Sequence, residues 1–230
     1  MDPTEVSPIK IEMPPIGYLA SDGDLFEDAN DLLRKMHDEL VRYQRAMLLY
    51  KSTFLDFSFT PGPKDDLTPE EEKKMANSIQ FTWLQIAAKD IIDSIWNFWW
   101  CLDKAVELTD RIESEDLRAA FSNLHGFKDQ FHRKLGKVTV ARHALAHRAE
   151  IQFNFKKNSH KGKLSWRGVV GKEKGGTLHI SDSLISAECI YVCTRKGELI
   201  EFKFSPDVLH WMTDQYLKLA TKKIPSPIGE

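Results

Sequence analysis

Histidine is concentrated in one part of the chain. The sequence has eight histidines, and four of them, His125, His132, His143 and His147, fall between positions 125 and 147. An imidazole exchanges protons near neutral pH and is the commonest general acid or base in enzymes. Arg142 adjoins His143, and its guanidinium is always charged and binds phosphate oxygens as a fixed fork. These residue types favour chemistry on a phosphate group.

The spacing within this segment decides which side chains can act together. From Arg142 to His147 the chain reads Arg-His-Ala-Leu-Ala-His. In a regular helix Arg142 and His147 lie about 140° apart around the axis, so they can flank a groove but cannot share one narrow pocket. A second copy, related by a two-fold axis, would place another such pair opposite. His143 and His147 are four residues apart and share a helix face.

The same two histidines also have the spacing of two metal ligands on one helix. Glu150 or His132 would then have to supply a third ligand. No HExxH or CxxC pattern accompanies them. We therefore predict no metal and no other cofactor.

Two plainer interpretations of Arg142 and His147 stay open. They could form part of a solvated basic surface, or Arg142 could pair with an acid such as Asp90 or Asp93. Those two aspartates stand in an otherwise apolar segment and need polar partners if they are buried.

Charge is distributed unevenly along the chain. Residues 1–127 carry a net charge of −11, residues 128–174 carry +10 and residues 175–230 carry −1. A basic segment attracts phosphates, so nucleic acid is the partner that this distribution favours. The basic residues near the motif that we predict to contact nucleic acid are Arg133, Lys134, Lys137, Arg148, Lys156 and Lys157.

The pattern Arg-polar-x-x-x-His resembles the signature of HEPN domains, which are bundles of four or five helices with the motif near the last core helix. The resemblance covers roughly residues 22–150. It implies a metal-independent ribonuclease in which a ribose 2′-hydroxyl attacks the neighbouring phosphorus and leaves a cyclic phosphate and a 5′-hydroxyl. Arg142 and His147 match the fixed positions of the motif, and His143 occupies its polar position, where Asn or Asp is commoner.

The resemblance also implies roles and partners. His147 would be the general base or acid, Arg142 would stabilise the developing charge, and His143 would position or share the proton. The implied partners are RNA, a second copy of the chain and a protein antitoxin or regulator, in bacterial defence or a stress response. The alternatives are a non-catalytic HEPN-like module that binds a nucleotide, RNA or a protein, and a purely structural dimer.

Composition sets the wider class of protein. The chain is 42% hydrophobic and 29% charged, which excludes a disordered chain. Its three cysteines form no disulfide framework and indicate a reducing compartment. Charged residues interrupt the most apolar stretch, residues 81–102, so we expect no membrane span, and we expect no signal peptide. The predicted location is the cytoplasm.

The elements that would position the motif are mainly helical. Apolar residues at alternating spacings of three and four predict a first helix that begins near residues 21–24. Thr68, Pro69 and Glu71 form a capping box that starts a second helix, which runs to about residue 109. A third helix is predicted from Ser114 to the stop at Gly136, and a fourth from 137 to 151.

After residue 150 the pattern changes to short β-branched and aromatic runs at 151–155, 164–170, 177–180, 189–194 and 198–204. We expect a mainly α protein, α+β overall. An extended arm (1–20) would precede an HEPN-like up-and-down helical bundle (21–150), a small antiparallel β region (151–205) and a closing helix with a tail (206–230). The tryptophans at 96, 99 and 100 are expected in the core or a dimer interface rather than as a surface for stacking bases.

Overall fold

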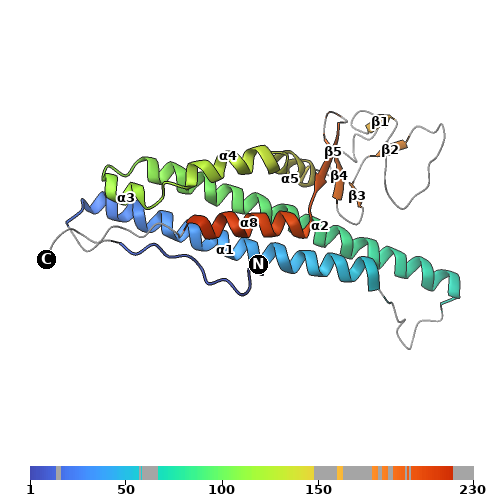
Figure 1. The fold of residues 1–230 in the computed structure, drawn as a ribbon. Coiled ribbons are helices and arrows are strands. Elements are labelled where there is room, and N and C mark those ends of the chain that lie inside the picture. Colours follow the sequence, from blue (N-terminus) through green and yellow to red (C-terminus); the bar gives the residue numbers. More distant parts are fainter. Residues whose placement is uncertain are drawn as a thin grey trace. The chain divides into compact units, whose positions relative to one another are not determined.

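The computed structural model describes residues 1–13, 17–56, 58, 67–147, 160–162, 178–180, 183–185, 189–194, 196 and 198–219. Its helices are α1 (Ala20–Asp56), α2 (Pro69–Asp110), α3 (Glu115–Ala119), α4 (Leu124–Leu135), α5 (Val138–Ala146) and α8 (Pro206–Leu219). Its strands are β1 (His160–Gly162), β2 (Leu178–Ile180), β3 (Ser183–Ile185), β4 (Cys189–Cys193) and β5 (Leu199–Lys203). The predicted class, mainly helical with a small antiparallel β region, is confirmed (Figure 1).

The chain folds into two compact units. Unit 1 contains Met1–Gln44, Ser94–Gly136 and Pro206–Glu230, and unit 2 contains Arg45–Asp93 and Lys137–Ser205. Both long helices, α1 and α2, contribute residues to each unit. Each unit is therefore built from separated stretches of sequence, whereas the predicted domains are continuous segments. The predicted boundary at residue 150 lies outside the described residues.

Helix α1 forms where the apolar spacing predicts a helix. Nine apolar residues follow this alternating spacing; eight of them are buried, and the ninth, Phe54, is half-buried. The buried ones are Phe26, Ala29, Leu33, Met36, Leu40, Tyr43, Met47 and Tyr50. Burial of an apolar side chain stabilises the fold by about 1.5–3 kcal/mol, so this stripe fixes which face of α1 points inward.

Helix α2 begins with the predicted capping box. The backbone N–H of Thr68 donates to Glu71 Oε2 over 2.8 Å, and the Thr68 hydroxyl donates to the same oxygen over 2.6 Å. In return, the Glu71 N–H donates to Thr68 Oγ1 over 3.4 Å. These hydrogen bonds to the charged carboxylate hold the pKa of Glu71 below its ordinary value.

The predicted single helix from 114 to 135 is wrong, because α3 and α4 are separate. The helix begins near Ser114 as predicted, and Ser114 caps α3, with its Oγ accepting from the Leu117 N–H at 3.4 Å. After α3 the backbone switches to bonds that span three residues, such as Phe121 N–H to the Arg118 oxygen at 3.0 Å. The tighter turn places the Phe121 ring 5.0 Å from that of Phe26 on α1, edge to face.

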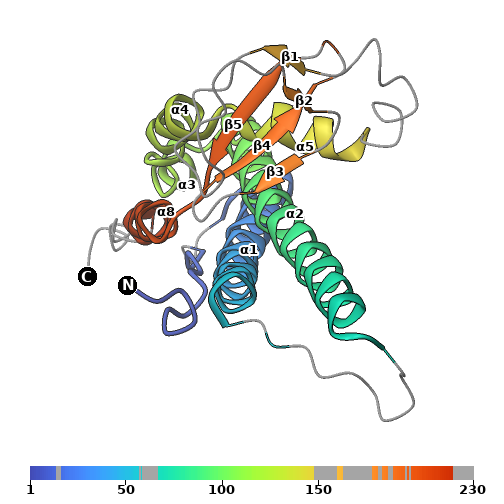
Figure 2. The same ribbon diagram turned by 90° about the vertical axis from the view of Figure 1, so that its right-hand side faces the viewer.

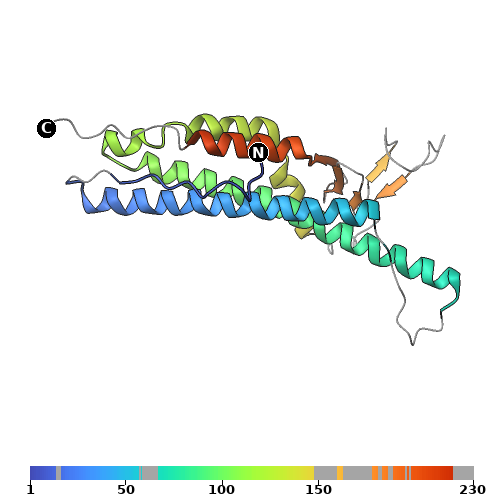
Figure 3. The ribbon, with the colours of Figure 1, turned by 60° about the horizontal axis from the view of Figure 1, so that its bottom comes forward.

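Helices α4 and α8 lie side by side in unit 1 (Figures 1 and 3). Trp211 of α8 packs against Phe127 and Phe131 of α4, with ring centroids 6.0 and 6.1 Å apart. Phe131 also stacks on Phe98 of α2 at 5.8 Å. These aromatic contacts connect three helices in one core.

The N-terminal arm follows helix α1 in unit 1 (Figure 3). Ile9 and Ile11 are buried. The Ile9 N–H donates to the hydroxyl of Tyr216 on α8 over 2.8 Å. Asn30 of α1 bonds both the N–H of Ile11, at 3.1 Å, and its carbonyl oxygen, at 2.9 Å. The arm therefore supplies apolar side chains and backbone hydrogen bonds to the core of unit 1.

In unit 2, β3, β4 and β5 form an antiparallel sheet in that order, and α5 packs against β4 and β5 (Figure 2). Ile190 pairs with Phe202, and Val192 with Ile200. Beside the last pair of this ladder, the Thr194 N–H donates to the Glu198 oxygen at 2.8 Å.

The other strand predictions differ in their outcome. β1 and β3 were not predicted; β1 pairs with β2 in a second antiparallel sheet. The runs predicted at 151–155 and 164–170 lie outside the described residues.

Where the structure is described, no helix combines the length and the apolar character needed to cross a membrane.

Candidate functional site

Helix α5 carries the Arg-His-Ala-Leu-Ala-His segment in unit 2. Val138, Ala141 and Ala144 are buried and form its inner face. The other side chains of this short helix point away from the inner face, and Arg142 and His143 lie beside that face. The helix ends at Ala146, so His147 is its C-cap residue.

His143 and His147 are brought together by the helix. Their ring centroids are 4.4 Å apart, and the ring planes are tilted by 59°. The His147 N–H donates to the His143 carbonyl oxygen over 3.1 Å, which continues the helical hydrogen-bond pattern to the cap. His143 is exposed and His147 is half-buried. The two imidazoles therefore lie next to each other, and the His143 ring is exposed.

Arg142 faces α2 within the same unit. Its Nε lies 3.9 Å from Asp93 Oδ1, and the other Asp93 oxygen lies 3.2 Å from Lys89 Nζ. The Arg142 side chain remains 41% exposed, against 24% for Asp93. The pairing considered from the sequence is thus present, but in a half-exposed position where the guanidinium can still meet an anion.

The six residues predicted to contact nucleic acid divide into three groups. Arg133 and Lys134 lie on α4 in unit 1, and Lys137 is the N-cap residue of α5 in unit 2; all three are exposed. Lys134 Nζ lies 4.6 Å from the centroid of the Trp211 ring, a cation–π contact. The remaining three, Arg148, Lys156 and Lys157, lie outside the described residues.

A cavity of about 340 Å³ opens on unit 1, between α2 and α4. It is lined by Trp99, Lys128, Asp129, His132 and Arg133. This site was not predicted from the sequence, although residues 128, 129, 132 and 133 have the spacing of one helix face. That spacing does not show that Trp99 of α2 lies opposite this face of α4.

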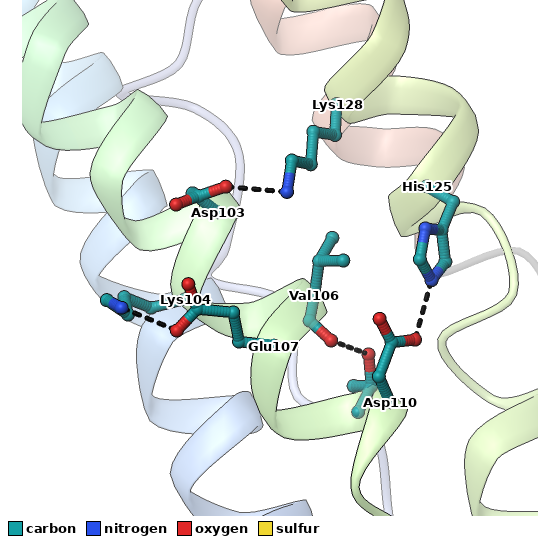
Figure 4. Close-up of polar contacts among 8 residues, drawn as sticks. Asp103, Lys104, Val106, Glu107, Asp110, His125 and Lys128 are labelled. Carbon is teal, nitrogen blue, oxygen red and sulfur yellow. Dashed lines mark hydrogen bonds and ion pairs between the residues drawn. The ribbon is translucent and has the colours of Figure 1, made fainter.

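Ion pairs between α2 and α4 border this part of unit 1 (Figure 4). Lys128 Nζ lies 2.6 Å from Asp103 Oδ1, and His125 Nε2 lies 2.7 Å from Asp110 Oδ1. The Lys128 and Asp103 side chains are about one-third exposed, at 32% and 30%. A pair this accessible contributes about 0–1 kcal/mol, so its main effect here is to fix where the lysine points.

A metal site at the two histidines would need a third ligand. Among the residues that the structure describes, no group of three or more His, Cys, Asp or Glu side chains is placed to hold a metal ion. Glu150, one of the ligands considered from the sequence, lies outside the described part of the chain.

The chain was compared with protein-family models, with curated proteins and with solved structures, and nothing matched. The HEPN resemblance therefore rests on the motif and on the order of the helices.

Proposed function

We propose that the chain is an HEPN-like, metal-independent ribonuclease whose active site is the Arg142–His147 segment at the C-terminal end of α5. The observation that carries the proposal is the pair of imidazoles on this helix, with ring centroids 4.4 Å apart, next to a half-exposed arginine. The two histidines supply a proton acceptor and a proton donor, and the guanidinium supplies charge stabilisation.

The reaction is an internal transfer at phosphorus. A base removes the proton of a ribose 2′-hydroxyl, and the 2′-oxygen forms a bond to the adjacent phosphorus. The bond from phosphorus to the 5′-oxygen of the next nucleotide breaks, and an acid protonates that oxygen. The products are a 2′,3′-cyclic phosphate and a 5′-hydroxyl, and no water or metal ion is consumed.

The residues of α5 fit the parts of this reaction. His147 moves the proton at the 2′-hydroxyl or at the leaving oxygen, and His143 positions or shares it. Arg142 binds the non-bridging oxygens as negative charge develops there. Asp93 holds the guanidinium from one side, so we assign it as a positioning residue.

The test is cleavage of a mixed RNA by the full chain in EDTA. His147→Ala is expected to lower the rate by at least about a hundredfold, which is the usual contribution of a general acid or base. Arg142→Ala is expected to have an effect of similar size. His125→Ala and Arg118→Ala are matched controls, because both side chains are exposed and lie on other helices.

The products and the variants together decide the outcome. Cyclic phosphate ends in the wild type, with loss of cleavage in both α5 variants only, would establish the activity. Cleavage that survives both substitutions would place it elsewhere. If the wild type cleaves no RNA but binds it through Arg142 and His147, the chain is the non-catalytic binding module instead.

A further inference from the structure

We propose that the cavity between α2 and α4 of unit 1 binds a nucleotide, with the base on Trp99 and the phosphate at Arg133 and His132. The proposal goes beyond the ribonuclease assignment, because these residues belong to neither α5 nor the motif. It names a second ligand site and a ligand class that combines a flat aromatic ring with an anion.

Trp99 is held as a stacking surface. Its indole packs on Phe131 with ring centroids 5.3 Å apart and planes only 20° from parallel. The same side chain is half-buried and lines the cavity. A ring fixed in this way loses little further freedom when a base stacks on it, and a base of any identity has a π-face to offer.

The α4 wall supplies polar groups with free hydrogen-bonding capacity. Arg133 and Asp129 are exposed, and neither side chain makes an ion pair or hydrogen bond with any residue in the described ranges. They are four positions apart and share a helix face with the cavity. Arg133 can bind a phosphate as a fork, and Asp129 can accept from an N–H group of a base.

His132 and Lys128 complete the wall between these two groups. The His132 ring lies beside Trp99, with centroids 6.2 Å apart, and is exposed. Lys128 is directed to Asp103 by the 2.6 Å ion pair of Figure 4, so its stem lines the cavity while its charge is shared with that carboxylate. The cationic groups left for an anion are therefore Arg133 and, when protonated, His132.

Size and charge favour a nucleotide over other aromatic ligands. The volume of about 340 Å³ falls at the small end of the range for small-molecule sites, roughly 300–1,000 Å³. An uncharged aromatic side chain would use Trp99 but leave the arginine without a partner. A free nucleotide and one base of an RNA chain offer the same chemistry, and the experiment distinguishes them.

The experiment is fluorine NMR of the full chain labelled with 5-fluorotryptophan, with the Trp99 resonance assigned from Trp99→Phe. The probes are adenosine and guanosine 5′-monophosphates, ribose 5-phosphate, and a short 2′-O-methyl oligonucleotide that cannot undergo 2′-hydroxyl attack. Nucleotides are expected to shift the Trp99 resonance. Ribose 5-phosphate, which lacks a base, is expected to bind at least about tenfold more weakly.

Matched variants identify the residues responsible. Arg133→Ala is expected to weaken binding about tenfold, read at the Trp99 resonance. Trp99→Leu and Trp99→Phe lack that resonance, so their affinities are measured by isothermal titration calorimetry. Trp99→Leu is expected to weaken binding about tenfold, and Trp99→Phe, which keeps a flat ring, by less. Arg118→Ala and Trp100→Leu are the controls, because both residues are exposed and neither lines the cavity. Because binding is read at the cavity and not as RNA cleavage, a failure of the ribonuclease proposal leaves this result unaffected.

Three outcomes would overturn the proposal: no Trp99 shift at millimolar nucleotide or with the oligonucleotide, an equal effect of ribose 5-phosphate, or equal losses in the control variants. Two outcomes support it and name the source of the ligand. Equal affinity for nucleotide and oligonucleotide indicates a free nucleotide. An oligonucleotide that binds at least about tenfold more tightly through the same residues indicates a base within RNA.

Discussion

Asp93 is one of the residues that set the position of Arg142. One of its oxygens lies 3.9 Å from Arg142 Nε and the other 3.2 Å from Lys89 Nζ. An arginine held on one side by a carboxylate keeps a defined direction but has part of its charge compensated. The contact with Asp93 can therefore orient the guanidinium toward a phosphate and at the same time weaken the binding of that phosphate by the guanidinium.

We expect Asp93→Asn to lower RNA cleavage about tenfold through kcat, a barrier increase of about 1.4 kcal/mol. Asparagine keeps the size of the side chain but loses the charge that holds Arg142, so the arginine is less often correctly placed. The measurement is kcat and KM for a defined RNA. Asp103→Asn, which changes an α2 aspartate in unit 1, is the control; a change in KM alone would contradict the positioning role.

Burial lowers the reactivity of the Cys101 thiol. Its side chain is 5% exposed, and burial, with a smaller contribution from the Glu39 carboxylate, raises the thiol pKa to about 11. A raised pKa leaves less reactive thiolate at neutral pH. Cys189 and Cys193 are also buried free thiols.

The expected consequence is that Ellman's reagent at pH 8 modifies the native protein at least about a hundredfold more slowly than the denatured protein, which should give three thiols. Raising the pH toward 11 should increase the native rate as the Cys101 thiolate forms. Ser122→Cys, at an exposed position, provides a fast-reacting reference. A wild-type thiol that reacts as fast as this reference would show that its surroundings open readily.

At the scale of elements, the turn from α4 to α5 depends on Gly136. A Cβ placed there would lie 2.5 Å from the carbonyl oxygen of His132, so the backbone would have to shift. The backbone at Gly136 has a helical φ of −57°, so the need for glycine comes from this close approach and not from an unusual conformation. The turn leads directly into the helix that carries the motif.

We expect Gly136→Ala to lower the free energy of unfolding by about 1–3 kcal/mol, as overpacking does. Gly126→Ala is the matched comparison, because Gly126 lies within α4 and a Cβ there meets nothing within 4 Å. Alanine in a helix interior is favoured over glycine by about 1 kcal/mol, so this change should stabilise the protein. Urea unfolding of both variants checks the opposite signs; shifts of the same sign would contradict the role given to the close approach.

Elements with a local cause were predictable from the sequence. The alternating stripe of α1 and the capping box of Thr68 and Glu71 act within a few residues of themselves, and both are present. The break between α3 and α4 was not predictable, because the apolar stripe from Leu117 onward fits a continuous helix. Contacts from distant parts of the chain accompany the break, including the bond of Asn123 Nδ2 to the Lys218 oxygen at 2.9 Å.

The histidine pair at α5 and the cavity between α2 and α4 differ in the same way: the first depends on local spacing and the second on the packing of distant segments. His143 and His147 are one turn apart on a single helix, so their proximity could be predicted from spacing alone. The cavity needed Trp99 of α2 to meet α4, and such a pairing depends on the packing of the whole unit. Sequence spacing could show that residues 128, 129, 132 and 133 share a face but not what that face meets.

For the whole molecule, the apolar residues left on the surface bear on oligomeric state. Trp83 and Ile86 of α2 are one turn apart and about half exposed, at 46% and 50%. Large apolar side chains in such positions are stabilised when a partner covers them. The homodimer expected from the HEPN resemblance would provide that cover.

We expect a dimer at micromolar concentration that Ile86→Glu converts to monomer without loss of helix content, because a buried carboxylate in the interface is unfavourable. Light scattering after size-exclusion chromatography and circular dichroism measure the two properties. Asn77→Glu, an exposed polar position on the same helix, is the control. A monomeric wild type would remove the groove between two protomers from the proposed ribonuclease.

The hydrogen bond between Ile9 and Tyr216 has a consequence for the timing of folding. These partners are 207 positions apart, and unit 1 also requires the middle stretch from 94 to 136. During synthesis the arm and most of α1 leave the ribosome long before α8 is made. Their apolar faces therefore stay exposed until α8 can pack on them. Pairings this distant form slowly. We therefore expect nascent chains that stop before residue 206 to need protection by chaperones, which a protease-sensitivity series of stalled chains would reveal.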